Sequence, residues 1–180
     1  YSPHYHPFKY LQRPFWGRLY FYGCLRFLLR FASAIVTITD NDTAFFLKYH
    51  KRVYKIPHQF ESSREVYRMP DTKQGNMILF VGRNDNNKGI FYLYTLDSKY
   101  EIHLVTKGGV KRKDFIVHNN ISSGELSALY ERAALVVIPS RYEAFSYVAL
   151  EAFAHGTPVV MSDRVMIADY LKDCKGYNTF

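Results

Sequence analysis

Two glutamates placed eight positions apart are the residues of this sequence best suited to hold a ligand rich in hydroxyl groups. Glu143 follows an apolar stretch, and Glu151 lies in a predicted helix, residues 146–155, that is otherwise built mainly from Tyr, Val, Ala, Leu and Phe. A carboxylate on an apolar helix is unfavourable unless it is paired or meets a polar ligand. Sugar or ribose hydroxyls would satisfy both carboxylates. The alternative is a helix cap at Glu143 and a surface side chain at Glu151.

Two cations follow a second apolar stretch, residues 77–81. Arg83 leaves the carboxyl end of this predicted strand, Gly82 permits a tight turn, and Lys88 lies near the start of the next predicted helix. Arginine binds two oxygens at once, lysine acts as a point charge, and a helix N-terminus attracts anions. The segment therefore predicts a clamp for a diphosphate. The alternative is a solvated turn with a helix-capping asparagine.

The start of the predicted helix 146–155 adds a third phosphate-binding element. Backbone N–H groups in the first turn of a helix have no partner inside the helix, and they bind phosphate well. We therefore expect the N–H groups of Ser146, Tyr147 and Val148 to contribute to the same anion site.

Short apolar strands alternate with helices in the second half of the chain, and these elements must position the charged side chains. Strands are predicted at residues 77–81, 102–106, 115–118, 135–138 and 159–161. Helices are predicted from Lys88 to about Leu96, over 146–155, and up to Arg132 after the capping-box pattern of Ser122 and Glu125. This alternation predicts an α/β fold: a Rossmann-like parallel sheet with helices on both faces and ligands at the carboxyl ends of the strands.

Residues 1–60 form a separate region. Its first part is broken by proline and glycine, and it then predicts a helix at 19–34, a strand at 35–38, a helix capped by Thr39 and a strand at 53–56. Residues 61–76 are polar with little periodicity, so we interpret them as a linker. The expected organisation is one region at 1–60, a linker at 61–76 and a Rossmann-like domain at 77–180.

The net charge of +8 favours anionic partners. The predicted helix 19–34 mixes arginines with aromatic residues, so it either contacts an anionic membrane or is a core helix with an unpaired apolar face. The basic cluster at 107–113 either adds to phosphate binding or is a solvated loop. We expect Cys24 and Cys174 to be free thiols in a reducing compartment, and His4 and His6 to be solvated rather than bound to metal.

The segments that carry the two carboxylates resemble a known family. Residues 139–145 read Pro-Ser-Arg-Tyr-Glu-Ala-Phe, and residues 151–160 read Glu-Ala-Phe-Ala-His-Gly-Thr-Pro-Val-Val. Together they are similar to the Glu-x7-Glu signature of retaining GT-B glycosyltransferases, glycosyltransferase family 4 (group 1) in particular. Gly82-Arg83 with Lys88-Gly89 resembles the phosphate-binding turn of the same family. The resemblance extends over about residues 19–180.

The resemblance implies a role for each candidate residue. Arg83 and Lys88 would bind the diphosphate of a nucleotide diphosphate sugar, and Glu143 would face the sugar hydroxyls. These three residues would be the catalytic residues. Glu151 would hold the ribose, and Gly82 would form the phosphate-binding turn. The remaining expected donor contacts are the backbone amides of Phe145, Ser146, Tyr147 and Val148. The nucleotide sugar is a substrate, and neither a cofactor nor a metal is expected.

The resemblance also implies an incomplete two-domain enzyme. Residues 1–60 would be the tail of the N-terminal, acceptor-side domain, and residues 77–180 a truncated C-terminal donor domain, so activity would need the missing part. The acceptor would be a saccharide or a lipid-linked sugar of polysaccharide biosynthesis. The expected location is the cytoplasm, at the inner face of the membrane, with no nucleic acid as partner. The family usually has Gly-Phe-Gly where this chain has Ala144-Phe145-Ser146, so we expect a different loop there if glycine was needed for a positive φ.

Two alternatives stay open. A GT-B isomerase of the nucleotide-sugar 2-epimerase type would share fold and donor but needs further acid/base groups. A non-catalytic basic module that binds phosphate or membrane would show steep salt dependence and no preference among nucleoside diphosphates. Glu143 and Glu151 argue against such a module, because a site for a polyanion has no use for paired acids.

Overall fold

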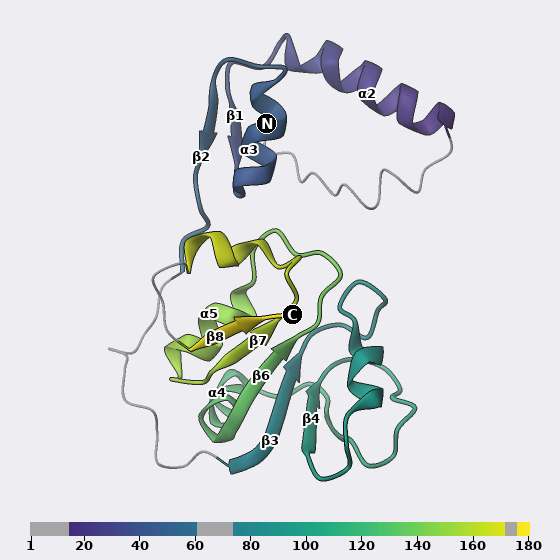
Figure 1. Cartoon of the computed structure of the whole chain (residues 1–180), viewed down its shortest axis with the longest axis vertical. Helices are drawn as coiled ribbons and strands as arrows, with labels where there is room; N and C mark the ends of the chain where they lie inside the picture. Colours follow the sequence, from purple (N-terminus) through teal and green to yellow (C-terminus); the bar gives the residue numbers. More distant parts are fainter. Residues whose placement is uncertain (1–14, 61–73, 172–175) are drawn as a thin grey trace. The chain divides into compact units, whose positions relative to one another are not determined.

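The computed structural model describes residues 15–60, 74–171 and 176–180 (Figure 1). The chain divides into two compact units, unit 1 at Tyr1–Gln59 and unit 2 at Phe60–Phe180. His4, His6 and Cys174 lie outside the described residues, as does most of the predicted linker.

Unit 1 is a small parallel β-α-β arrangement with one further helix. Strands β1 (Ile35–Thr37) and β2 (Val53–Lys55) pair in parallel, and helix α3 (Asp40–Leu47) connects them. The predicted cap is confirmed, because Thr39 Oγ1 accepts a hydrogen bond from the N–H of Asp42 at 3.0 Å. The core is formed by Leu29, Ile35 and Phe46.

Helix α2 (Phe15–Leu29) begins and ends earlier than the predicted 19–34. Several of its large apolar side chains are exposed, among them Trp16, Phe27 and Leu28. Cys24 in this helix is a free thiol. Among the described residues, no helix is both long and apolar enough to cross a lipid bilayer.

Unit 2 is built on a parallel sheet of six strands, and the predicted α/β fold is confirmed. The strands are β3 (Gln74–Val81), β4 (Glu101–Val105), β5 (Ile116–His118), β6 (Ala133–Ile138), β7 (Val159–Met161) and β8 (Tyr177–Thr179). Their order across the sheet is β5-β4-β3-β6-β7-β8, and each neighbouring pair is parallel. The chain therefore builds one half of the sheet outward from β3 and then returns to start the other half at β6.

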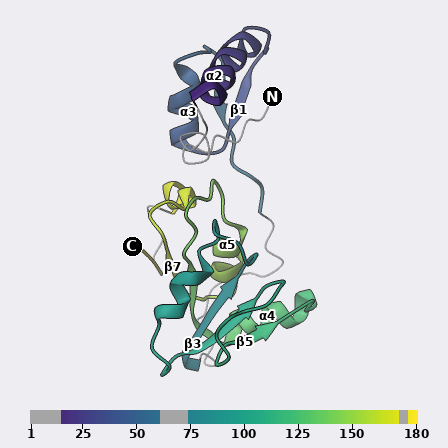
Figure 2. The same cartoon turned by 90° about the vertical axis from the view of Figure 1, so that its right-hand side faces the viewer.

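Different helices cover the two faces of this sheet (Figures 1 and 2). Helices α4 (Ser123–Arg132) and α5 (Tyr147–Ala154) pack on one face, over a core that includes Met77 and Leu79 of β3. The 3-10 helix η1 (Ile90–Thr95) packs on the other face, over a core that includes Ile78 and Phe80. Successive side chains of β3 thus point to opposite faces of the sheet and pack into different cores, as expected for a strand buried on both faces.

The helix predicted to run from Lys88 to about Leu96 is wrong in type. Gly89 is left-handed, with φ of 69°, and only the six residues of η1 follow in 3-10 geometry. Bulky aromatic and β-branched residues fill this segment, Ile-Phe-Tyr-Leu-Tyr-Thr, and such residues favour an α-helix weakly. The α-helix dipole expected next to Lys88 is therefore replaced by that of a 3-10 helix of six residues.

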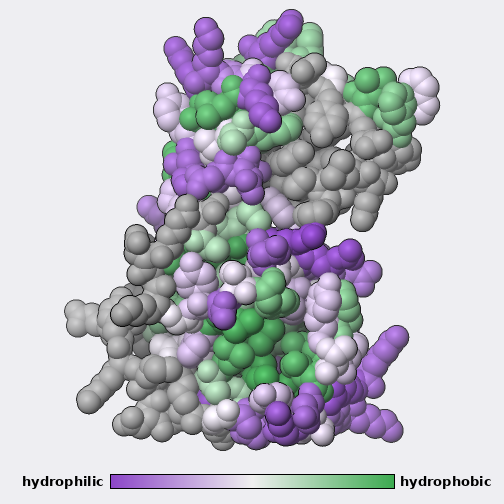
Figure 3. Space-filling model, in the orientation of Figure 1, coloured by the Kyte–Doolittle hydropathy of each residue, from purple (hydrophilic) through white to green (hydrophobic). Residues whose placement is uncertain are grey.

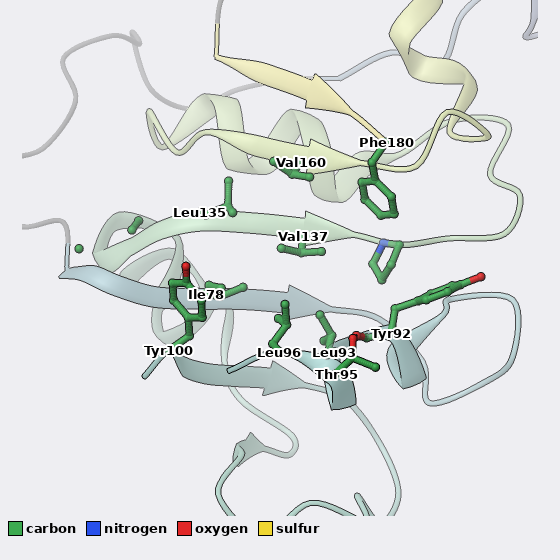
Figure 4. A pocket seen from close by; sticks show the side chains of 13 residues that line it. Ile78, Tyr92, Leu93, Thr95, Leu96, Tyr100, Leu135, Val137, Val160 and Phe180 are labelled. Carbon is green, nitrogen blue, oxygen red and sulfur yellow. The ribbon is translucent and has the colours of Figure 1, made fainter. Parts of the chain in front are cut away.

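The face covered by η1 carries an open apolar groove of about 500 Å³. Figure 3 shows apolar surface over the middle of unit 2, and Figure 4 shows Ile78, Val137 and Val160 projecting into the groove from three adjacent strands. The C-terminal Phe180 also lines it and is 57% exposed. Of these three strand residues, Val137 and Val160 are half-buried and Ile78 is buried.

Candidate functional site

The carboxyl ends of β3 and β6 meet at the centre of the sheet, where the strand order reverses. In open parallel sheets, ligands bind in the crevice at such a switch point. The segments that leave these two strands are residues 82–89 and 139–146, and they contain most of the candidate residues predicted from the sequence. The fold thus brings together two segments that lie more than fifty residues apart in the chain.

Two hydrogen bonds, one between backbone groups and one from a side chain, join the two segments directly. The N–H of Arg141 donates to the carbonyl of Asn87 at 2.7 Å, and Asn87 Nδ2 donates to the carbonyl of Tyr142 at 3.0 Å. At Gly89, a Cβ atom would lie 2.0 Å from the carbonyl oxygen of Pro139, and φ is positive. Only glycine can occupy this position without a shift of the backbone.

Lys88 and Glu143 form an ion pair across this junction. Lys88 Nζ lies 3.0 Å from Glu143 Oε2, and both side chains are mostly buried, with 21% and 13% exposed. Ser140 Oγ donates to the same carboxylate oxygen at 2.9 Å. Gly82 lies beneath the lysine stem, because a Cβ there would be 3.6 Å from Lys88 Cγ. Three of the predicted site residues are therefore in one cluster.

The backbone of Glu143 is fixed on both sides by a third segment. Its N–H donates to the carbonyl of Arg164, and its carbonyl accepts from the N–H of Met166. Behind it, Ser162 Oγ donates to the carbonyl of Ser140 at 2.6 Å. Ser140 also lines a polar cavity of about 290 Å³, whose other lining residues are Tyr92, Pro139, Arg141, Ser162, Asp163, Arg164 and Phe180. The carboxylate is thus held in a defined place at the edge of the crevice.

Arg83 is exposed, with its side chain 77% accessible, and it pairs with Asp85 at 3.1 Å. Asp85 also organises the turn, since its Oδ1 accepts from the N–H groups of Asn87 and Lys88. The turn is therefore capped by Asp85 rather than by the asparagine considered from the sequence. The guanidinium lies at the crevice on a long, accessible side chain.

Helix α5 begins at the crevice. Ser146 is its N-cap, is fully buried and accepts a hydrogen bond from the N–H of Ala149. Phe145 and Tyr147 contact each other edge to face, and Val148 packs on the core. Ser146 has φ of −106°, and Asn120 is the only non-glycine residue with positive φ in the described part of the chain. Ala144 and Ser146, which stand where the family usually has glycine, therefore both have a negative φ.

Glu151 lies one turn into α5 and is half-buried. Its Oε2 accepts a hydrogen bond from the hydroxyl of Tyr130, on α4, at 2.7 Å. Burial, together with the Glu151 charge, raises the pKa of the Tyr130 phenol far above its usual value, so that this phenol stays a donor. The ring of Tyr130 stacks on His155, whose Nδ1 donates to the backbone carbonyl of Glu151 at 2.8 Å.

A histidine pair lies on the adjoining strands. His103 Nδ1 and His118 Nε2 are 2.9 Å apart, and His103 Nε2 contacts Glu101 at 2.6 Å. Burial, with smaller contributions from the charges of His103 and Arg132, lowers the pKa of His118, and Glu125 opposes this shift. His118 is therefore more strongly held in its neutral form than a solvated histidine.

The basic cluster at 107–113 is partly structural. Arg112 forms a two-pronged contact with Asp114 and donates to the carbonyls of Tyr94 and Leu96. Its guanidinium also lies 4.9 Å from the centre of the Phe115 ring. Arg112 thus closes the loop after β4 onto η1.

Reasoning from the sequence assigned no role to four residues that shape the site: Asn87, Gly89, Tyr130 and Ser140. Gly89 had a readable signal in the Lys-Gly pair of the phosphate-binding turn. Tyr130 lies in a helix more than twenty positions before Glu151, and no sequence spacing indicates that these two side chains meet.

This architecture matches a known protein family. A family model described as glycosyl transferases group 1 matches residues 61–179. Among relatives, an uncharacterized glycosyltransferase, MJ1607, of Methanocaldococcus jannaschii is 41% identical over 104 residues, which are 48% of this chain and 27% of that protein. The chain therefore spans much less than two thirds of that curated relative.

Solved structures show the same fold. Sucrose-phosphate synthase of Thermosynechococcus elongatus matches with a TM-score of 0.71 at 22% identity, over 94% of this chain and 49% of that one. The pneumococcal O-GlcNAc transferase GtfA, solved with UDP and GlcNAc, matches with a TM-score of 0.59 at 16% identity, over 80% of this chain and 33% of that one. With a family match over most of its length and a six-stranded parallel sheet of GT-B type, the chain belongs to the group 1 family of glycosyl transferases.

Proposed function

We propose that this chain carries the donor-binding half of a glycosyltransferase that moves a sugar from a nucleotide diphosphate sugar to a saccharide or lipid-linked acceptor, with retention, as in glycosyltransferase family 4. The observation that carries the proposal is the cluster of Lys88, Glu143 and Ser140 at the switch point of the sheet. A cation and a carboxylate side by side fit a donor that has a diphosphate next to a ring of hydroxyls.

Each group has a task in this proposal. Arg83 swings from Asp85 onto the diphosphate, and Lys88 shares its charge between Glu143 and a phosphate oxygen. Both would stabilise the negative charge that develops on the leaving diphosphate. The start of α5, with the backbone of Phe145, Ser146, Tyr147 and Val148, would add N–H groups near the same charge. Glu143 would accept hydrogen bonds from the sugar, and Glu151 from the ribose.

The proposal also indicates which molecules this chain would meet. The pneumococcal neighbour was solved with UDP, so a nucleoside diphosphate is a suitable first ligand to test. Residues 1–60 would be the end of the acceptor-side domain. The exposed aromatic residues of α2, such as Trp16 and Phe27, would allow contact with a membrane that presents a lipid-linked acceptor.

The experiment is a calorimetric titration of the purified chain with UDP, GDP and ADP. Saturable binding of one diphosphate is expected, with affinity reduced about tenfold or more in Arg83→Ala and in Glu151→Ala, because each removes a hydrogen bond to a charged group. Arg52→Ala, which removes an exposed arginine of unit 1, serves as the charge-matched control. A folded chain that binds none of the three, or binds all equally and loses them with salt, would contradict the proposal and favour a basic module.

A further inference from the structure

Glu151 is placed by one hydrogen bond from a neighbouring helix. Among the described residues, the Tyr130 hydroxyl is the one side-chain partner of its carboxylate. A carboxylate has two oxygens and about four acceptor positions, and this contact uses one of them. Glu151 is half-buried, and among the described residues no hydrogen bond is made to its Oε1.

Tyr130 itself is immobilised at several points. It is 1% exposed, its ring stacks on His155 with centroids 5.3 Å apart, and its backbone carbonyl accepts from Thr157 Oγ1 at 2.6 Å. Thr157 and His155 both belong to the end of α5 or the turn after it. The contacts with His155 and Thr157 therefore hold the Tyr130 side chain in place against α5, and its hydroxyl reaches Glu151 from a fixed position.

We propose that Tyr130 is a positioning residue that fixes the Glu151 carboxylate for a vicinal diol, and that its hydroxyl thereby sets the preference of the site for ribonucleotides over deoxyribonucleotides. The inference rests on the proposed donor site. With Oε2 held by the phenol, Oε1 and the remaining lone pairs of the carboxylate point in a fixed direction, and two adjacent hydroxyls can donate to them together. If the carboxylate could rotate freely, a diol would bind it little better than a single hydroxyl. The second hydrogen bond would require the carboxylate to be held in one orientation, and the entropy lost would offset the gain.

The test compares Tyr130→Phe with the unchanged chain. The substitution removes only the hydroxyl and retains the ring that stacks on His155 and the carbonyl that Thr157 contacts. Calorimetry is carried out with the nucleoside diphosphate that the chain binds and with its 2′-deoxy and 3′-deoxy forms. Tyr130→Phe is expected to weaken the ribonucleotide by about fivefold to tenfold and to leave the deoxy forms nearly unchanged. The ratio between ribonucleotide and deoxynucleotide should therefore fall.

Two further variants separate positioning from folding. In Glu151→Gln the added change Tyr130→Phe should cause little further loss of affinity, because both act through one carboxylate. Tyr94→Phe, on the other face of the sheet, should bind all three ligands as the unchanged chain does. Equal weakening of all three ligands by Tyr130→Phe, or no weakening of any, would overturn the inference while leaving the donor site intact. Absence of binding by the unchanged chain would instead overturn the proposed function, and the inference with it.

Discussion

At the scale of single residues, the ion pair of Lys88 and Glu143 combines a structural and a chemical role. Both side chains are mostly buried, so each charge depends on the other. A donor would enter by replacing part of this contact with its own phosphate and hydroxyls. The two charges of this pair thus compensate each other within the site.

Lys88→Met is expected to lower the free energy of unfolding by about 2 kcal/mol, because it leaves a buried carboxylate with Ser140 as its remaining side-chain partner. Urea unfolding followed by circular dichroism measures the change. The double variant Lys88→Met with Glu143→Gln should recover part of the loss, since the unpaired charge is removed. A double variant less stable than the sum of the two single changes would rule out this explanation.

Gly89→Ala is expected to destabilise unit 2 by more than about 2 kcal/mol and to weaken nucleotide binding. The new Cβ would collide with the carbonyl of Pro139, and alanine would have to adopt a positive φ. The matched control is Gly124→Ala, where a Cβ meets nothing within 4 Å and φ is not positive. Thermal unfolding should show a drop for the first variant and no loss for the second.

At the scale of elements, the sequence could predict those that carry their own signals. Ser122 with Glu125 predicted the start of α4, and both bonds of the capping box are present. The strands of β3, β4, β6 and β7 were readable because apolar runs of suitable length are bounded by polar turns. Such signals are local, so one sequence is enough to read them.

Other elements could not be read because they depend on distant partners. Strand β8 has three residues and exists through its pairing with β7. Helix η1 adopts 3-10 geometry after Gly89, where a Cβ atom would collide with the carbonyl of Pro139 in the distant segment that follows β6. The bond from Tyr130 to Glu151 likewise depends on how α4 packs beside α5. The sequence could thus predict which residues belong to the candidate site, but not which distant residues they contact.

Ser122→Ala is expected to reduce the stability of unit 2 by about 1 kcal/mol, because the N–H of Glu125 loses its acceptor. The reciprocal bond from the N–H of Ser122 to Glu125 contributes to the lowered pKa of that carboxyl. Ser123→Ala, one position later in the same turn, is the control and should change stability little. Equal effects of the two changes in urea unfolding would show that the cap is not the cause.

At the scale of the whole molecule, His118 is a source of pH dependence of stability near neutral pH. Its pKa is lowered in the folded chain by burial and by His103 and Arg132, against the opposing charge of Glu125, while Glu101 holds His103. Between the lowered folded value and the ordinary value of about 6.5, the unfolded chain binds more protons than the folded one. Stability from this group is therefore full above about pH 6.5 and declines as the pH falls below it.

His118→Gln is expected to show a smaller loss of urea midpoint between about pH 7.5 and about pH 5.5 than the unchanged chain, since it has no proton to take up. His58→Gln, at an exposed position in unit 1, should follow the unchanged chain. The opposite result, with a steeper loss in His118→Gln, would mean that the folded state favours the charged histidine.

The strand order has a consequence for how the chain reaches its folded state. Strands β3 and β6 are neighbours at the centre of the sheet, yet β4, β5 and α4 lie between them in the chain. Closing so long a loop is entropically unfavourable, and folds dominated by such distant pairings assemble slowly. Because the crevice forms only where these two strands meet, we expect the proposed nucleotide site to be completed in the final stage of folding, after the β3–β4–β5 half has assembled.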